Sequence, residues 1–142
     1  MFAKQLTVFI ENRAGRLSEV LGVLKKNGVN IISMSLSDTT EFGLLRLIVN
    51  DATKGKEKLT EEGYSSLTSN VSIIEITHKV GSLQELLEAM DKRGVNIEYM
   101  YGLSIESDAA YVVLKASNAE KVDEILGDLG IRTLDNDALS HL

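Results

Sequence analysis

The chain has 142 residues, of which 44% are hydrophobic and 25% charged, and it contains no cysteine, proline or tryptophan. That length suits one ordinary domain or two very small ones. The missing cysteines exclude disulfides, thiolate metal sites and a cysteine nucleophile. No apolar run is long enough to cross a membrane, and the segment after Met1 alternates like a strand, unlike a signal peptide. We therefore expect a soluble, cytoplasmic protein with no membrane partner.

The net charge of −6 is unevenly distributed along the chain. Residues 1–68 contain 9 basic and 8 acidic side chains, a net charge of +1, whereas residues 69–142 contain 6 basic and 13 acidic ones, a net charge of −7. Neither half has the clustered Lys and Arg that bind a phosphate backbone. Nucleic acid is therefore disfavoured as a partner.

The first half of the chain predicts the order strand, helix, strand, strand, helix, strand. Alternating or β-branched segments indicate strands at residues 5–10, 30–37, 42–50 and 64–68. Helices are expected between Gly15 and Gly28 and at residues 51–62, where Gly55 weakens the middle. A polar turn at residues 38–41 joins the second and third strands.

The second half predicts the same order after a two-residue linker, Ser69-Asn70. Strands are expected at residues 71–77, 96–104, 109–116 and 131–134, with a turn at residues 106–108. Helices are expected at residues 82–93 and 119–129, the latter with Ser117 as its N-cap. Residues 135–142 form a short tail with one helical turn.

The two halves are copies of one unit. A shift of 66 positions aligns residues 12–31 with residues 78–97, and nine of the twenty pairs are identical without a gap. Two βαββαβ units predict an α+β fold of two ferredoxin-like modules side by side, each with an antiparallel sheet and both helices on one face. The predicted module boundaries are residues 1–68 and 69–142.

Each copy has a glycine-containing loop between its first strand and first helix. Gly15 and Gly81 let the backbone approach a ligand or adopt positive φ, and the free amides at the helix N-terminus favour a carboxylate. The alternative is that both glycines only permit a tight turn. Arg13, Arg16 and Lys79 add positive charge that could steer an anion or could simply be solvated.

Asn30 and Asn96 recur at the start of the second strand of each copy, where asparagine is intrinsically unfavourable. Their side-chain amides can donate to a carboxylate and accept from an ammonium group. Asx-type turns would explain them equally well.

These motifs resemble the ACT domain, a family of small regulatory modules that sense amino acids. The resemblance rests on residues 11–17 (ENRAGRL) followed by residues 26–31 (KNGVNI), and on the matching positions of the second copy. It covers nearly the whole chain and indicates a freestanding tandem ACT protein.

The resemblance implies a ligand site at the interface between two modules, where the loop of one faces the second strand of its neighbour. Main-chain amides of residues 14–17 and 80–83 would hold the ligand carboxylate, and the asparagines would hold its polar groups. The predicted ligand-binding residues are Asn12, Arg13, Ala14, Gly15, Arg16, Leu17, Asn30 and Ile31 in the first copy, and His78, Lys79, Val80, Gly81, Ser82, Leu83, Asn96 and Ile97 in the second.

Two departures from the family pattern affect the loops. Ala14 and Val80 stand where the family usually has proline, which makes the loops less preorganised. His78 replaces the loop asparagine, so the two sites are not expected to be equivalent. His78 could hydrogen-bond a ligand or be an exposed loop residue.

The sequence therefore predicts a non-enzymatic regulatory protein that binds a free amino acid or similar small carboxylate. The alternative is a pure interaction protein or regulatory subunit without a small ligand. A homodimer or a partner enzyme is compatible with both. The sequence has no triad, P-loop or paired-histidine motif, so catalysis, a metal site and a cofactor are not expected.

Overall fold

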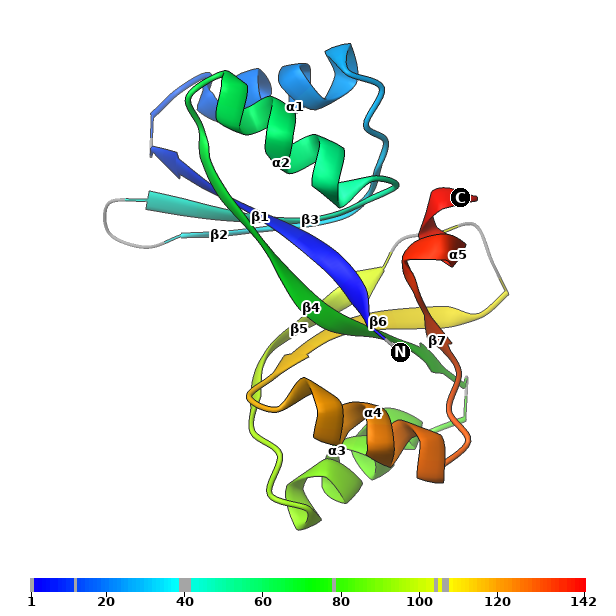
Figure 1. Ribbon diagram of the computed structural model, residues 1–142. Coiled ribbons are helices and arrows are strands. Elements are labelled where there is room, and N and C mark those ends of the chain that lie inside the picture. Colours follow the sequence, from blue (N-terminus) through cyan, green and yellow to red (C-terminus); the bar gives the residue numbers. More distant parts are fainter. Residues whose placement is uncertain (1, 12, 39–41, 78, 104, 106–107) are drawn as a thin grey trace. The chain divides into compact units, whose positions relative to one another are not determined.

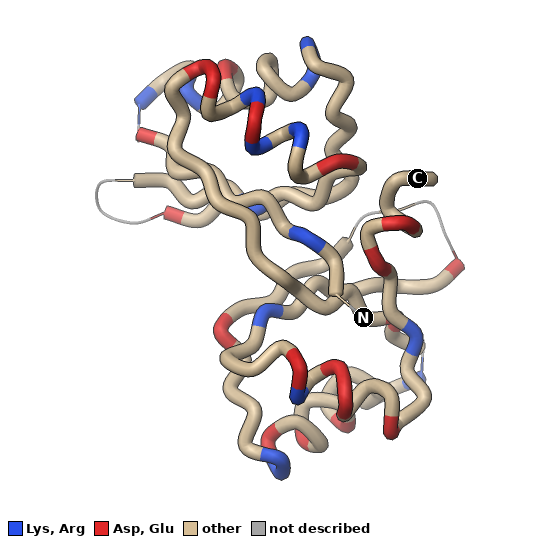
Figure 2. Tube along the Cα trace, viewed as in Figure 1, with Lys and Arg blue, Asp and Glu red and all other residues tan. Residues whose placement is uncertain are grey.

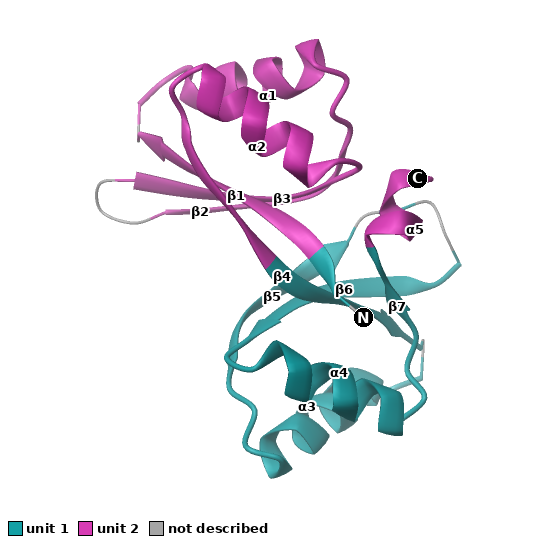
Figure 3. Ribbon diagram, in the orientation of Figure 1, with its two compact units in different colours: residues 1–3, 70–135 teal, residues 4–69, 136–142 magenta. Residues whose placement is uncertain are grey.

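The computed structural model describes residues 2–11, 13–38, 42–77, 79–103, 105 and 108–142 (Figure 1). The chain forms two compact units (Figure 3). Residues 4–69 and 136–142, magenta in Figure 3, make up the unit here called the N-terminal module. Residues 1–3 and 70–135, teal in Figure 3, make up the C-terminal module.

The N-terminal module contains four strands and two helices from the first repeat. In chain order they are β1 (Ala3–Glu11), α1 (Arg16–Lys26), β2 (Ile31–Asp38), β3 (Phe42–Val49), α2 (Ala52–Glu61) and the beginning of β4 (Ser65–Ile76). The strand order is β4-β1-β3-β2, and β3 pairs antiparallel with both β1 and β2. Both helices lie on one face of this sheet (Figure 1).

The C-terminal module repeats this arrangement. It contains the end of β4, then α3 (Ser82–Lys92), β5 (Ile97–Leu103), β6 (Ala110–Ala116), α4 (Ala119–Asp128) and β7 (Thr133–Leu134). Its strand order is β7-β4-β6-β5, with all pairs antiparallel. Both modules therefore have the ferredoxin-like order, which confirms the predicted fold class.

A short C-terminal helix, α5 (Asn136–Ser140), groups with the N-terminal module rather than with the repeat that precedes it. The backbone N–H of Lys4 donates to Oδ1 of Asn136 at 2.8 Å, and Leu139 is 1% exposed. The predicted helical turn is present, but the sequence offered no sign of where it would pack.

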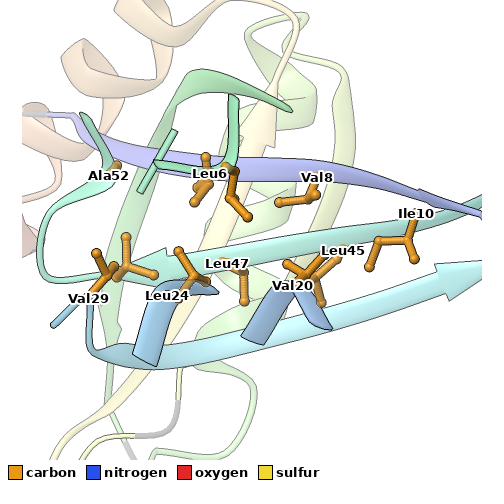
Figure 4. Packing of buried hydrophobic residues seen from close by; sticks show 11 residues of the cluster. Leu6, Val8, Ile10, Val20, Leu24, Val29, Leu45, Leu47 and Ala52 are labelled. Atoms are coloured by element: carbon orange, nitrogen blue, oxygen red, sulfur yellow. The ribbon is translucent and has the colours of Figure 1, made fainter. Parts of the chain in front are cut away.

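The cores follow from the alternation of apolar residues along the strands. In the N-terminal module Leu6 pairs with Leu47 and Val8 with Leu45, and these side chains meet Val20 and Leu24 of α1 (Figure 4). The C-terminal core is built in the same way, from Ile74, Leu86, Met90, Leu114, Val122, Ile125 and Leu126. Helical and strand periodicities thus bring one apolar face of each element inward.

Two local predictions differ from the structure. The predicted linker at residues 69–70 is wrong, because β4 runs unbroken from Ser65 to Ile76 and its polar residues are compatible with exposed strand positions. Asn118, and not Ser117, is the N-cap of α4, since Oδ1 of Asn118 accepts from the N–H of Lys121 at 3.1 Å. Most of the turn predicted at residues 38–41, part of the turn at 106–108 and the strand end at 104 lie outside the described residues.

Candidate ligand-binding site

The loop between β1 and α1 is shaped by glycine. Gly15 has φ +89°, the left-handed region that L side chains rarely adopt, and Gly81 has φ +84° at the equivalent place before α3. A Cβ built on either glycine would meet nothing within 4 Å. The backbone conformation, not a shortage of space, therefore calls for glycine at both positions.

The helices that follow these glycines differ from the other long helices of the modules in how they begin. Asp51 and Asn118 cap α2 and α4 with side-chain hydrogen bonds to the amides of Lys54 and Lys121. Neither α1 nor α3 has such a side-chain cap among the described residues. The amides of Arg16 and Ser82 donate to the carbonyls of Arg13 and Lys79 at 3.4 and 3.2 Å. The amides that follow them in the first turn, such as those of Leu17 and Leu83, are therefore the ones available to an anion.

A cavity of about 530 Å³ opens beside the N-terminal loop. Four predicted residues, Arg13, Ala14, Gly15 and Leu17, line it together with the end of β1 and the end of β2. Sequence reasoning missed the rest of the lining, which consists of Ile10, Glu11, Leu36, Ser37, Asp38 and Gly43. The lining combines apolar side chains with groups of both charges, as small-molecule sites do.

Some of the charged side chains around this cavity form ion pairs with one another. Glu11 Oε2 lies 3.5 Å from Nε of Arg13 and 3.5 Å from Nη2 of Arg16. Among the described residues, the Asp38 carboxylate makes no ion pair. Asp38 is therefore the lining carboxylate that could receive a ligand cation.

Arg16 is held away from the cavity by α1 and the turn after α2. Its Nη1 donates to Oε2 of Glu19 at 2.9 Å, and the hydroxyl of Tyr64 donates to the same oxygen at 2.8 Å. The hydrogen bonds from Tyr64 and then from Arg16 lower the pKa of Glu19 below its ordinary value. The Arg16 side chain thus stabilises the start of α1, while its backbone amide remains part of the loop.

Asn30 and Ile31 do not join this cavity. They line a separate hollow of about 400 Å³ with Leu21, Lys25, Gly28 and Val29. The backbone of Asn30 is fixed by Asn50, which donates its N–H to the Asn30 carbonyl at 3.1 Å and accepts the Asn30 N–H on Oδ1 at 2.9 Å. Because the side chain that acts as acceptor belongs to Asn50, the Asx-turn interpretation of Asn30 is not supported.

The equivalent loop of the C-terminal module is arranged differently. Val80 is 96% exposed, and Ser82 Oγ donates to the carbonyl of Thr77 at 2.8 Å. Lys79 Nζ lies 3.8 Å from Glu85 Oε1. Leu83 is half-buried, Asn96 is exposed and accepts the N–H of Ser117 on its carbonyl, and Ile97 packs against the core. Ser82 is the predicted residue that lines a cavity in this module, with different neighbours.

Two predicted site residues, Asn12 and His78, lie outside the described residues. The described part of the chain has no helix long and apolar enough to span a membrane. Within that same part, no three His, Asp or Glu side chains converge as a metal site would require.

The comparisons with known proteins agree with this architecture. Residues 1–142 match the family model described as an ACT domain pair. The crystal structure of protein BT0572 from Bacteroides thetaiotaomicron is 34% identical, with a TM-score of 0.92 over 100% of this chain and 98% of that one.

Two further relatives are enzyme subunits by name. The acetolactate synthase isozyme 3 small subunit of Escherichia coli (strain K12) is 26% identical over 136 residues, 87% of this chain and 82% of that protein. The ligand-free regulatory subunit of aspartate kinase from Thermus thermophilus shares the fold, with a TM-score of 0.59 at 17% identity over 88% of this chain and 91% of that one. From the family match and the fold, the chain belongs to the ACT domain pair family.

Proposed function

We propose that the chain is a non-enzymatic regulatory protein that binds a free amino acid, or a similar small carboxylate, at the β1–α1 loop of its N-terminal module. The observation that carries the proposal is the uncapped start of α1, with left-handed Gly15 beside a cavity of about 530 Å³. A small carboxylate is the natural guest of such amides.

The lining offers a matching group to the carboxylate, the ammonium group and the side chain of an amino acid. The amides of the first turn of α1 would take the carboxylate, and the Asp38 carboxylate would take the ammonium group. Ile10, Leu17 and Leu36 offer apolar surface to an aliphatic side chain. A few charge-assisted hydrogen bonds and one buried side chain are enough for micromolar binding, about −8 kcal/mol.

Asn30 enters the proposal only through the family resemblance. Within its own module it lines a hollow different from the cavity of the loop. That a second module brings an asparagine to the loop stays a prediction. Asn30→Ala should weaken ligand binding without unfolding the protein, because the side chain of Asn30 is exposed and its described hydrogen bonds are made by the backbone.

Regulation implies a protein partner as well. Relatives of this chain are named as small or regulatory subunits, which supports a catalytic protein as the partner. Exposed Val80 and Leu36 offer apolar contact surface for one. A pure interaction protein without a small ligand is the second candidate, favoured by the C-terminal loop, whose Val80 and Gly81 line none of five cavities formed by the described residues.

A thermal-shift screen against the twenty amino acids tests the proposal. A ligand at about 100 times its Kd adds about 2.7 kcal/mol and should raise Tm by several degrees. Asp38→Asn should reduce the shift, whereas the exposed helix variant Glu57→Gln serves as the matched control. If no amino acid changes Tm at millimolar concentration, the ligand-binding proposal fails and the interaction protein is favoured.

A further inference from the structure

The two modules differ sharply at one equivalent corner, where the first strand, the first helix and the turn after the second helix meet. In the N-terminal module Arg16 and Tyr64 both donate to Glu19 at this corner and line a cavity of about 270 Å³. A shift of 66 or 67 positions places Ser82, Ile131 and Glu85 at these sites. The glutamate is therefore retained, while both of its hydrogen-bond donors are replaced by smaller side chains.

The backbone supports this correspondence. Tyr64 donates its N–H to the carbonyl of Leu59 at 2.9 Å, and Ile131 donates to Leu126 at 3.0 Å in the same way after the second helix. Gly63 and Gly130, immediately before them, both have positive φ. The two corners thus have equivalent backbone conformations and differ in their side chains.

The C-terminal corner also has a cavity of about 270 Å³, and all of its lining belongs to this module. Its apolar walls come from β4, α3 and the turn after α4, namely Ile76, Leu86, Ala89, Leu129 and Ile131, with Thr77 and Ser82 also lining it. The N-terminal cavity differs in its lining: Arg16 and Tyr64 stand in place of Ser82 and Ile131, and the counterparts of Leu86 and Ala89 do not line it.

Two carboxylates, Glu75 and Glu85, complete the lining. Glu75 stands where the N-terminal module has Phe9, is half-buried, and makes no ion pair with any residue that the structure describes. Glu85 meets only Lys79 there, at 3.8 Å, and both side chains are mostly solvent-exposed, so this pairing is weak. The cavity therefore has an apolar wall and a negatively charged rim.

The surrounding helices add to the negative electrostatic potential of this rim. Helices α3 and α4 together carry seven acidic and two basic side chains, whereas α1 and α2 carry three acidic and six basic ones. Figure 2 shows the acidic positions along α3 and α4. An anionic ligand is disfavoured at this corner, and a cation is attracted to it.

We propose that this corner cavity binds an alkylguanidinium ligand, whose guanidinium takes the place that Arg16 occupies in the N-terminal module. The planar guanidinium donates two parallel hydrogen bonds to a carboxylate and is weakly hydrated, which suits the half-buried Glu75. The alkyl chain covers the apolar wall. The contact of Arg16 with Glu19 in the N-terminal module thus illustrates how the ligand would contact Glu85.

The ligand could be a free small molecule or an arginine side chain of another protein, and both present the same chemistry. A titration of the full-length protein, followed by 15N NMR, separates these sources. One arm uses butylguanidinium, the second uses N-acetylarginine amide as a mimic of a protein-borne side chain, and the third uses uncharged butylurea. We expect saturable shifts around Glu75, Glu85 and Ile131 in at least one of the first two arms and none with butylurea.

Variants assign the binding to the cavity. Glu75→Gln/Glu85→Gln should weaken binding by about tenfold or more, since two charge-assisted contacts are lost. Glu88→Gln is the matched control on the same helix, because Glu88 pairs with Lys92 and Gln84 and does not line the cavity. Ser82→Arg/Ile131→Tyr, which introduces the two residues that donate to Glu19 in the N-terminal module, should abolish binding and raise Tm.

The proposal is overturned if neither guanidinium probe saturates at millimolar concentration, if butylurea binds equally well, or if the glutamine double variant binds like the unmodified protein. These outcomes are separate from those of the amino-acid screen, because the proposed amino-acid site lies in the other module. The double glutamine variant changes only partly exposed side chains, so it tests the site even if the Ser82→Arg/Ile131→Tyr variant fails to fold.

Discussion

The hydroxyl of Tyr64 donates a hydrogen bond of 2.8 Å to Glu19 although 45 positions separate the two residues. Arg16 donates to the same carboxylate oxygen at 2.9 Å. The turn after α2 is thereby connected to the first turn of α1, immediately after the Gly15 loop. The pKa of Glu19 is lowered and that of Tyr64 is raised, each chiefly by this shared hydrogen bond.

Glu19→Gln should make stability less dependent on acidic pH. Because the pKa of Glu19 is lower in the folded protein than in the unfolded chain, its contribution is fully present above the unfolded value and is lost as pH falls through the folded one. Urea unfolding at neutral pH and at about pH 3 measures this. The stability gap between the unmodified protein and the variant should shrink in acid, and a constant gap would contradict the assignment.

Gly55 and Gly22 should respond in opposite directions to alanine. Both lie in helices, where alanine is favoured by about 1 kcal/mol. A Cβ on Gly55 would lie 3.0 Å from Leu6 and 3.4 Å from Leu24, both fully buried, whereas a Cβ on Gly22 would meet nothing within 4 Å. Gly22→Ala should stabilise by about 0.5–1 kcal/mol.

Overpacking costs about 1–3 kcal/mol, so Gly55→Ala should be neutral to destabilising by about 2 kcal/mol. Denaturant midpoints of the two variants decide this. Equal stabilisation by both substitutions would show that the core adjusts freely around α2. If Gly55→Ala does not stabilise the protein, close packing against Leu6 and Leu24 requires the glycine that the sequence suggests as a weakness of this helix.

Gly15→Ala should destabilise the protein by about 1–2 kcal/mol through its backbone alone, because φ is positive and the space around the glycine is open. Gly15→Asn should cost less, since asparagine tolerates the left-handed region better. Thermal unfolding of both variants measures the difference. If alanine and asparagine cost the same, the cost has another origin than φ.

The caps of the second helices give a further test. Asp51→Ala and Asn118→Ala should each cost about 1 kcal/mol, because each removes the side-chain acceptor of a helix amide. Ser117→Ala is the control, since Ser117 precedes the cap and its described hydrogen bond is a backbone one. A larger loss from Ser117→Ala than from Asn118→Ala would show that the cap is misassigned.

The repeat made most of the fold predictable. Identical residues at a shift of 66 positions place a glycine loop, a helix and the start of the next strand in the same order twice, and the periodicities of β1 and α1 identify their buried faces. The left-handed conformations of Gly15 and Gly81 agree with the predicted loops. These features depend on local patterns that survive in a single sequence.

Other features depend on long-range pairing and could not be predicted. Asp38 reaches the cavity because β2 and β3 pair in a register that puts it opposite Gly43, and nothing in the local sequence fixes that register. The continuity of β4 and the packing of α5 likewise depend on tertiary contacts. The sequence repeat aligns Arg16 with Ser82 and so shows one difference between the corners. Only the fold shows that Tyr64 contacts Glu19 and that Ile131 takes its place.

The most direct test of the central claim is an amide NMR titration of the full-length protein with the amino acid that gives the largest thermal shift. The proposal predicts saturable shifts that are largest at the amides of Gly15, Arg16 and Leu17, and that weaken in Asp38→Asn but not in Glu57→Gln. Shifts that leave this loop unchanged, or that are the same in Asp38→Asn, would contradict the amino-acid site proposed at the β1–α1 loop.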